Sequence, residues 1–189
     1  MAGFTVLLDA CVLYPAPIRD LSLRLAEAGL FRVSWATQIH EEWMNSLLSN
    51  NDSIQRANLE RTCQDMQDAF PEADVKGFER LIDVLERPDP NDRHVLAAAI
   101  RCKADAILTF NLRDFPADSL TRWDIEAIHP DVFFENQFDL SKEKFIKAVK
   151  EQRSSLRRPP YTVDEFLSAL IKSQIPRTAE LLRRFESII

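Results

Sequence analysis

Asp9 is the residue whose position most strongly suggests chemistry. It closes an apolar run, residues 4–8 (FTVLL), which has the composition of a buried parallel strand. A lone acid at that point, followed by Ala10, Cys11 and Val12, has little reason to be there unless it binds something. Because ligands of an open parallel sheet bind beyond the carboxyl ends of its strands, Asp9 is the first candidate for a functional group.

Two further acids could reach the same edge of a sheet. Residues 106–110 (AILTF) predict a second buried strand, and Asn111 and Asp114 follow it closely. Asp92 falls in the first turn of the helix that is predicted before this strand. If the two strands are neighbours in the sheet, Asp9, Asp92 and Asp114 meet at one point.

Glu42 is a fourth candidate, on the helix predicted over residues 38–49. The apolar stripe of that helix consists of Ile39, Trp43 and Leu47. At about 100° per residue, Glu42 lies about 100° from the centre of the stripe, whereas Glu41 lies about 160° from it. We therefore expect Glu42 to face the sheet and Glu41 to face solvent.

A cluster of acids has a definite chemical meaning. Several carboxylates at one point cannot all stay ionised without a counter-charge. Hard oxygen ligands of this kind select Mg²⁺ or Mn²⁺. A bound divalent ion can activate water and stabilise the charge that builds on a phosphate during in-line displacement. The pattern therefore predicts a Mg²⁺ or Mn²⁺ site that serves phosphate chemistry.

Each acid also has a purely structural interpretation. Asp89 before Pro90 is a common helix start, in which case Asp92 only favours the helix dipole. Glu42 alone could be a solvated helix residue, and Asp114 could form a turn. The prediction of a site rests on the acids taken together.

Other catalytic classes find little support. The histidines match no zinc spacing, and we interpret all three as incidental: His40, His94 and His129. The chain has no G-x-S-x-G motif and no glycine-rich phosphate loop. A phosphotransfer domain with Asp9 as nucleophile would need a D-x-D motif or a later lysine. Position 11 is Cys11, and no lysine follows the Thr109 strand.

The elements that would position the acids alternate along the first 134 residues. Apolar runs predict strands over residues 4–8, 31–35, 106–110 and 125–128, and helical patterns cover residues 17–29, 38–49, 53–69 and 90–103. A short extended piece could form at residues 74–76. This alternation implies right-handed crossovers. The expected fold class is therefore α/β: a three-layer α/β/α fold with a central parallel sheet of four or five strands.

Residues 135–189 show helical patterns only, and we expect a helical C-terminal extension there, after a domain over residues 1–134. Leu140 and Phe145 predict a hydrophobic staple around a cap at Ser141, which opens a helix to about residue 152. Residues 162–165 (TVDE) form a capping box that opens the next helix, and Pro176 opens the last one.

Charge is divided unevenly along the chain. The net charge is −6, yet residues 1–134 carry 13 Lys and Arg against 22 Asp and Glu, whereas residues 135–189 carry 11 against 8. An acidic body that gathers divalent cations, joined to a basic tail, remains compatible with a nucleic acid substrate.

Cysteine usage and hydropathy indicate the compartment. The three cysteines, Cys11, Cys63 and Cys102, include no C-x-x-C pair and fit reduced thiols. No charged-then-apolar leader and no run of about 18 apolar residues occurs. We expect a cytoplasmic protein that makes no membrane contact.

Four segments, in this order, resemble the PIN-domain family and within it the VapC-like toxins of type II toxin–antitoxin pairs: VLLDACVLYPAPIRDL, QIHEEW, PDPNDRHVLAAAI and ILTFNLRDF. The resemblance covers about residues 4–134. It implies a parallel sheet flanked by helices, a Mg²⁺ or Mn²⁺ site and endonucleolytic cleavage of RNA. It further implies a cognate antitoxin protein as partner and growth inhibition as the outcome.

The resemblance also assigns roles to residues. The first three family acids fall on Asp9, Glu42 and Asp92. Where many members have an acid two residues after the strand threonine, this sequence has Asn111 after Thr109, so Asp114 is the nearest carboxylate. The implied catalytic and metal-binding set is Asp9, Glu42, Asp92 and Asp114, with Thr109 and Asn111 in support.

The C-terminal residues are similar to helical extensions of some of these toxins. Their apolar helix faces suit packing on the domain, an antitoxin or a second subunit of a homodimer. Arg153, Arg157 and Arg158 are candidate RNA contacts, and a solvated basic loop is the alternative for them. The alternative for the whole protein is a non-catalytic PIN scaffold that binds RNA or a protein partner.

Overall fold

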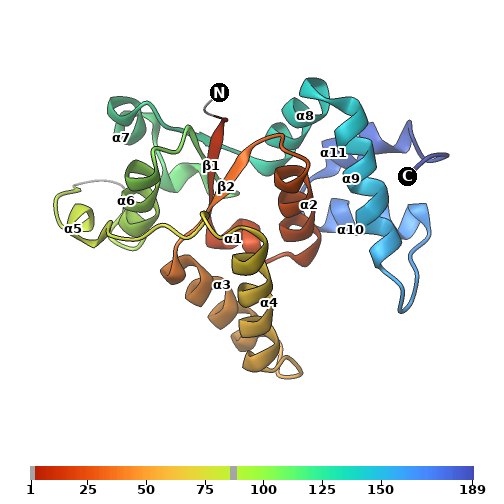
Figure 1. Ribbon diagram of the computed structural model, residues 1–189, viewed down its shortest axis with the longest axis horizontal. Coiled ribbons are helices and arrows are strands. Elements are labelled where there is room, and N and C mark those ends of the chain that lie inside the picture. Colours follow the sequence, from red (N-terminus) through yellow and green to blue (C-terminus); the bar gives the residue numbers. More distant parts are fainter. Residues whose placement is uncertain (1–2, 86–88) are drawn as a thin grey trace. The chain divides into compact units, whose positions relative to one another are not determined.

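The computed structural model of the chain describes residues 3–85 and 89–189 (Figure 1). The chain forms two compact units, and neither is a single continuous segment. The sheet unit comprises Met1–Tyr14 and Arg32–Ile128, and the helical unit comprises Pro15–Phe31 and His129–Ile189. The chain therefore passes between the units three times.

Four parallel strands in the order β2-β1-β3-β4 form the sheet. They are β1 (Thr5–Leu8), β2 (Arg32–Ser34), β3 (Ala106–Leu108) and β4 (Glu126–Ile128). All residues of β1 and β3 are buried, as their continuous apolar runs predict. Leu8 lies opposite Leu108 in the register of these two strands. The adjacency on which the site prediction depends is thus confirmed.

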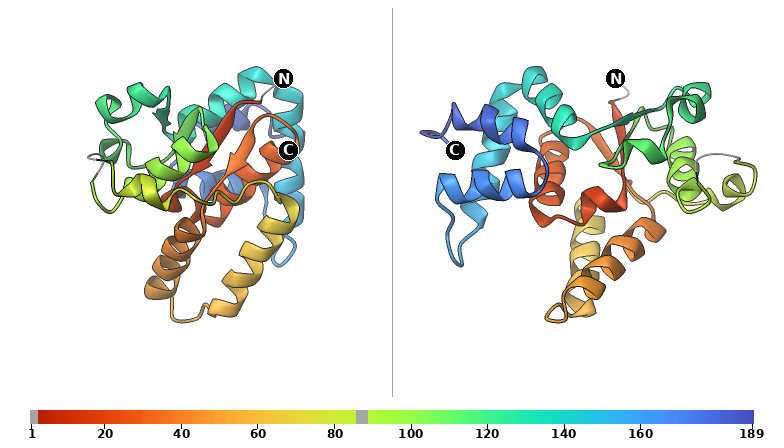
Figure 2. Two further views of the ribbon diagram at one scale, coloured as in Figure 1. Left: turned by 60° about the vertical axis from the view of Figure 1, so that its left-hand side comes forward. Right: turned by 180° about the vertical axis from the view of Figure 1, so that it is seen from behind.

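Helices of the sheet unit follow the predicted alternation with strands. They are α1 (Ala10–Leu13), α3 (Thr37–Asn50), α4 (Arg56–Ala69), α5 (Glu79–Ile82), α6 (Arg93–Cys102) and α7 (Ala117–Leu120), with 3₁₀ turns η1 (Leu112–Asp114) and η2 (Thr121–Trp123). The largely buried α6 packs against β1 and β3, and α3 and α4 lie side by side as a hairpin (Figure 2). The expected extended piece is a single bridge between Trp35 and Asp74.

The helical unit joins one early helix to the last four. It contains α2 (Ala16–Glu27), α8 (Pro130–Leu140), α9 (Lys142–Ser155), α10 (Val163–Lys172) and α11 (Pro176–Arg183). α2 packs against α9, where Nε2 of Gln152 donates to the carbonyl of Pro17 at 2.7 Å. The domain division predicted at residues 134 and 135 stays a prediction, while the structure groups α2 with the C-terminal helices.

Asp131 ties α8 to the start of α11. Its buried carboxylate accepts the backbone N–H groups of Arg177 (2.9 Å) and Thr178 (2.8 Å), and the hydroxyl of Thr178 (2.7 Å). N–H groups in the first turn of a helix have no partner within the helix. A residue 46 positions earlier in the chain therefore caps α11.

One predicted helix start is right in position, and another is wrong. α9 begins after Ser141 as predicted, but Leu140 is 67% exposed and Ser141 makes no side-chain cap hydrogen bond, so the predicted hydrophobic staple does not form. α6 begins at Arg93 with Asp92 at its N-cap, not at Asp89 and Pro90.

Other expectations for the fold hold. The capping box of Thr162 and Glu165 is present, and α11 begins at Pro176. The predicted fold class, a PIN-like three-layer α/β/α fold with additional C-terminal helices, is confirmed with a sheet of four strands. Across the residues that the structure describes, no helix has both the length and the apolar character needed to cross a membrane.

Candidate metal centre

Asp9 lies at the carboxyl edge of the sheet, directly after β1. Its N–H donates to the carbonyl of Leu108 at 3.1 Å, which holds Asp9 beside the end of β3. Only 8% of its surface is exposed. Oδ1 accepts the N–H of Ala10 at 2.6 Å. Oδ2 accepts the hydroxyl of Thr109 at 2.7 Å and the thiol of Cys11 at 3.1 Å.

The backbone after β3 fixes the direction of these two donors. The N–H of Asn111 donates to Oγ1 of Thr109 at 3.0 Å, and the N–H of Phe110 donates to Sγ of Cys11 at 3.3 Å. The Thr109 hydroxyl therefore directs its own proton to Asp9. Because a carboxylate oxygen has about two acceptor sites, Oδ2 of Asp9 is filled and Oδ1 keeps one site open. The arrangement presents Oδ1 as the atom that can bind a metal.

Burial raises the pKa of Asp9 above its ordinary value, and the hydrogen bonds from Thr109, Cys11 and Ala10 oppose this rise. The charge of Glu42 raises the Asp9 pKa further, so the two carboxylates interact through space. Burial, followed by the charge of Asp9, also raises the pKa of the Cys11 thiol to about 12. Cys11 is therefore protonated at neutral pH and can donate to Asp9.

Asp92 is the acid on which the charges of three other aspartates act. Burial, followed by the charges of Asp114, Asp9 and Asp89, raises its pKa to about 6, whereas His94 lowers it. Its side chain makes no capping hydrogen bond to α6, although Asp92 occupies the N-cap position. The carboxylate is thus not engaged as a helix cap.

Glu42 and Glu41 point in different directions from α3. Oε1 of Glu42 lies 2.9 Å from Nε2 of His94, a buried residue of α6, although the Nε2–H direction is not that of a hydrogen bond. Glu41 instead forms an ion pair with Arg56 of α4. The structure places Glu42 on the α6 side, as the helical periodicity predicts, and its role as a metal ligand stays a prediction.

Asp114 and Asn111 contribute in different ways. Asp114 lies in η1, and among the charges that raise the pKa of Asp92 its charge has the largest effect. Asn111 is exposed and supports Thr109 through its backbone N–H. The structure thus brings the carboxylate of Asp114 into the acidic group, and its assignment as the fourth metal ligand stays a prediction.

The acidic group has the chemistry of a metal site. Within residues 3–85 and 89–189, no group of three or more His, Cys, Asp or Glu side chains is arranged so that it could hold a metal ion. The four acids instead interact through space, and their mutual repulsion is the kind that a divalent cation relieves. All of them offer hard oxygen ligands, which Mg²⁺ and Mn²⁺ prefer. The donor set therefore fits such an ion.

Cys11 and His94 contact the acids, although neither was predicted as a site residue. Cys11 binds Oδ2 of Asp9, and His94 lies against Glu42. Each stands two positions after a candidate acid, in D-x-C and D-x-H, and that spacing is the only sequence signal for them.

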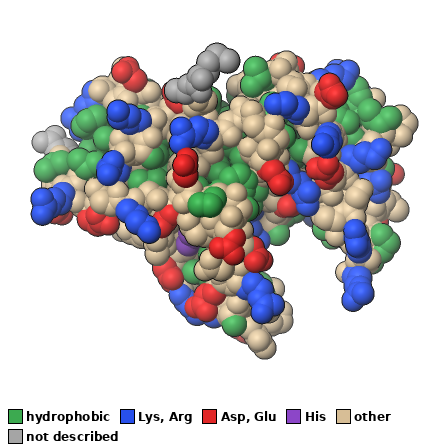
Figure 3. All heavy atoms as spheres, in the orientation of Figure 1, with side chains coloured by type: hydrophobic (Ala, Val, Ile, Leu, Met, Phe, Trp, Pro, Cys, Tyr) green, Lys and Arg blue, Asp and Glu red, His purple; other side chains and the backbone are tan. Residues whose placement is uncertain are grey.

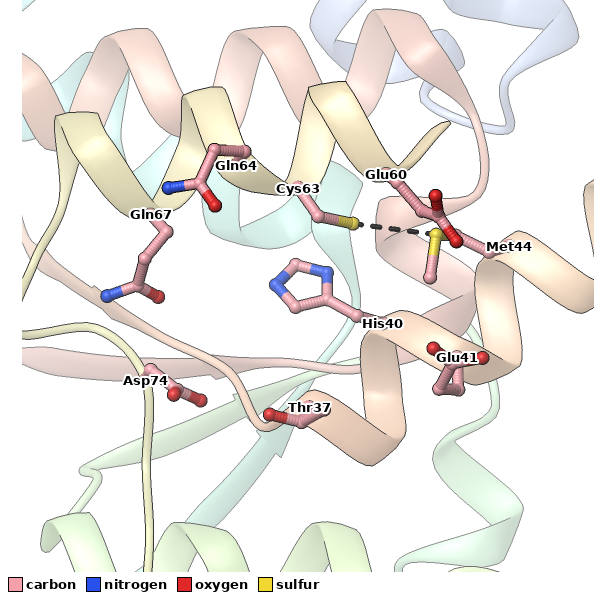
Figure 4. Close-up of a pocket in the computed structure, with 9 residues that line it drawn as sticks. All are labelled: Thr37, His40, Glu41, Met44, Glu60, Cys63, Gln64, Gln67 and Asp74. Atoms are coloured by element: carbon pink, nitrogen blue, oxygen red, sulfur yellow. Dashed lines mark hydrogen bonds between the residues drawn. The ribbon is translucent and has the colours of Figure 1, made fainter. Parts of the chain in front are cut away.

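A separate pocket of about 250 Å³ lies between α3 and α4 (Figure 4). Its lining includes Glu41 and His40, and none of the four candidate acids. Nδ1 of His40 accepts the indole N–H of Trp43 at 3.0 Å, and Sγ of Cys63 lies 3.7 Å from Sδ of Met44. These contacts give His40 and Cys63 roles in packing. The pocket is therefore distinct from the acidic edge of the sheet.

The three arginines predicted to contact RNA lie in the helical unit. The guanidinium of Arg153 donates to the carbonyls of Tyr161 (2.8 Å) and Ile189 (3.0 Å). Arg157 and Arg158 are exposed in the loop after α9. Arg153 is thus engaged within its unit, and contact with RNA stays a prediction for all three.

Comparison with known proteins covers both units. The PIN domain family matches residues 5–113, and the VapC50 C-terminal domain family matches residues 130–184. The chain is 42% identical over 93 residues to a protein of Mycobacterium tuberculosis (strain ATCC 25618 / H37Rv) named "Putative ribonuclease VapC50". This match covers 49% of the chain and 54% of the relative, so the chain spans about half the length of that curated protein.

No solved structure gives a significant match to the chain. The assignment rests on the parallel sheet, the acids at its carboxyl edge and the family match over more than half of the residues. The chain belongs to the PIN-domain family, as a VapC-like member with a C-terminal extension.

Proposed function

We propose that this protein is an endoribonuclease that uses Mg²⁺ or Mn²⁺ and acts as the toxin of a toxin–antitoxin pair. One arrangement carries the proposal: Asp9 lies buried at the carboxyl edge of the sheet, and its charge acts with those of Asp114 and Asp89 on Asp92 at the start of α6. Like charges held together destabilise a fold unless a cation compensates them. The name of the relative from Mycobacterium tuberculosis supports RNA as the substrate.

In this proposal, Asp9, Glu42, Asp92 and Asp114 hold the ion, with Asp9 offering Oδ1. When bound, the ion supplies an activated water and compensates the charge that develops on the phosphate. Thr109 and Cys11 orient Asp9 through their hydrogen bonds to Oδ2. His94 of α6 lies beside Glu42. Among the chain's own residues, Thr109 and Cys11 therefore fix the direction of Asp9, the first of the four acids.

The test is cleavage of RNA by the purified chain with Mg²⁺, with Mn²⁺ and with EDTA. We expect cleavage only with a metal ion, and a loss of roughly 100-fold or more in Asp9→Asn. Glu41→Gln is the matched control, because Glu41 is a carboxylate that pairs with Arg56 away from the site. Cleavage by Asp9→Asn at the wild-type rate would refute the site. RNA binding without metal-dependent turnover would identify a non-catalytic scaffold.

The toxin role has its own test. Induced expression of the wild-type chain should arrest growth, whereas Asp9→Asn should not. A cognate antitoxin protein should restore growth by binding the wild-type chain. If the wild-type chain and Asp9→Asn both arrest growth, the toxicity does not depend on RNA cleavage.

A further inference from the structure

Positive charge is concentrated in one stretch of the helical unit. Residues 142–158 contain seven Lys and Arg and two Glu, although the net charge of the whole chain is −6. Figure 3 shows Lys and Arg side chains over α9 and at the tip of the loop that follows it. The stretch has the charge of a surface that attracts a polyanion.

Two of the seven cations are engaged within the unit. Nζ of Lys142 lies 4.2 Å from the ring centroid of Phe185. Arg153 donates to two backbone carbonyls. The other five are exposed, and we name them the basic surface: Lys144, Lys147, Lys150, Arg157 and Arg158.

The lysines of the basic surface line one side of α9. Lys144, Lys147 and Lys150 recur every three residues, and they span about 9 Å of the helix axis. Within the described ranges, only Lys147 of the five forms an ion pair, with Glu151 at 3.8 Å. Exposed pairs of this kind are weak. These cations therefore remain available to a ligand.

The two arginines of the basic surface lie on the loop after α9, which is held in place. Arg157 forms an isolated antiparallel bridge with Pro160, and the guanidinium of Arg153 holds the carbonyl of Tyr161 at the end of the loop. A loop held in this way loses less entropy when it binds a ligand. Arg153 thus positions the loop, while Arg157 and Arg158 present their charges to solvent.

The sheet unit carries a net negative charge. Residues 1–14 and 32–128 carry 11 Lys and Arg against 19 Asp and Glu. A polyanion gains most of its affinity from Lys and Arg contacts to phosphates, and an acidic surface repels it. If the acids of the sheet unit cut RNA, the basic surface of the helical unit has the charge that favours affinity for the RNA backbone.

We propose that the basic surface docks the phosphate backbone of the RNA, independently of its sequence. The inference rests on the proposed function for the identity of the polyanion. The surface binds single-stranded RNA through phosphate contacts that release counterions, which makes the affinity strongly salt-dependent. Arg153 acts as a positioning residue and not as a phosphate contact.

The experiment measures RNA binding by the full chain in EDTA, where metal-dependent cleavage cannot occur. The probe is a fluorescently labelled single-stranded RNA oligonucleotide, followed by anisotropy over a range of salt concentrations. The first variant combines Arg157→Ser and Arg158→Ser, and the second combines Lys144→Gln, Lys147→Gln and Lys150→Gln. A double variant, Lys172→Gln with Arg183→Gln, removes two positive charges from α10 and α11 and is the matched control.

We expect the slope of log K against log salt to become shallower by about 1.4 in the arginine variant and by about 2 in the lysine variant, at about 0.7 per lost contact. The control should keep the wild-type slope. Wild-type slopes in both test variants would overturn the proposal. The proposal would also be overturned if the test variants bound RNA as well as the wild-type chain does but no longer bound polyglutamate. That result would identify an acidic protein as the partner of the basic surface.

Cleavage by the wild-type chain with Mn²⁺ is measured separately. Shallower slopes without any wild-type cleavage would keep the docking surface and refute the nuclease. If the wild-type chain cleaves RNA and the test variants keep the wild-type salt slope, the nuclease is kept and the docking surface is refuted. Circular dichroism of each variant confirms that the helical unit is intact.

Discussion

The hydroxyl of Thr109 donates to Oδ2 of Asp9 at 2.7 Å, and the two residues directly follow the neighbouring strands β3 and β1. The two residues are 100 positions apart in the chain. The orientation of the first acid therefore depends on the pairing of β1 with β3.

Removing that hydroxyl should weaken metal binding. In Thr109→Val, Oδ2 of Asp9 loses its closest donor, and we expect Mn²⁺ affinity and RNA cleavage to fall about 10- to 100-fold. Thr109→Ser keeps the donor and should retain most of both. Electron paramagnetic resonance of free Mn²⁺ measures the affinity without RNA. Equal affinities in the two variants would contradict an orienting role.

The neighbouring acids of α3 offer a direct comparison. Glu42→Gln should lower Mn²⁺ affinity about 10-fold or more, because it removes a charged oxygen that interacts with Asp9. Glu41→Gln should leave it unchanged, since that carboxylate pairs with Arg56. Isothermal titration calorimetry with Mn²⁺ measures both. Similar losses in the two variants would show that overall charge, and not position, sets the affinity.

Asp92 should make the metal-free protein less stable as the pH rises. Its folded pKa, about 6, lies above the unfolded value of about 3.9. The folded chain therefore binds this proton more tightly than the unfolded chain. The contribution of Asp92 to the free energy of unfolding falls as the pH rises from about 4 through 6, and stays low above that.

Thermal melting at two pH values tests the direction of this pH dependence. In EDTA near pH 7.5, Asp92→Asn should melt at a higher temperature than the wild-type chain, and near pH 4 the difference should shrink. Saturating Mn²⁺ should raise the melting temperature of the wild-type chain more than that of the variant. A variant that is less stable than the wild type in EDTA at neutral pH would contradict the prediction.

Asp131 should stabilise the helical unit by capping α11. In Asp131→Ala, two backbone N–H groups and the Thr178 hydroxyl lose a buried acceptor, at a cost of about 1–3 kcal/mol in the free energy of unfolding. Asp139→Ala, at an exposed position of the same helix, is the control. Urea denaturation measures both. Equal midpoints for the two variants would show that the cap contributes nothing.

Cys11 should be unreactive in the native protein. Its thiol pKa of about 12 leaves almost no thiolate at about pH 8, and only the thiolate attacks iodoacetamide. Mass spectrometry of tryptic peptides should show Cys11 modified in urea and spared in the native chain. Equal modification in both states would mean that the hydrogen bond to Asp9 does not form in solution.

The sheet and the ends of its strands could be predicted because their signals are local. β1 and β3 are buried on both faces, which leaves continuous apolar runs in the sequence. Asp9 then stands out as the acid that ends the first run. The choice of Glu42 over Glu41 follows from the angle between neighbouring residues of a helix.

Other features depend on contacts that no local pattern records. α8 lacks a clear apolar stripe, because Phe133 and Phe134 are adjacent and both buried. The contact of His94 with Glu42 requires α3 and α6 to lie together. The contact of Cys11 with Asp9 requires the turn between β1 and α1. Such contacts follow from packing and not from residue spacing.

The grouping of α2 with α9 has a consequence for the order of synthesis. α2 ends at Glu27, whereas α9 begins only at Lys142. At roughly 5–20 residues per second, several seconds or more pass between the two on the ribosome. During that interval the sequence of the whole sheet unit is completed. α2, whose buried residues include Ile18, Leu21 and Leu25, meets α9 only afterwards. The nascent chain therefore already contains all four acids before α9 is available to pack against α2.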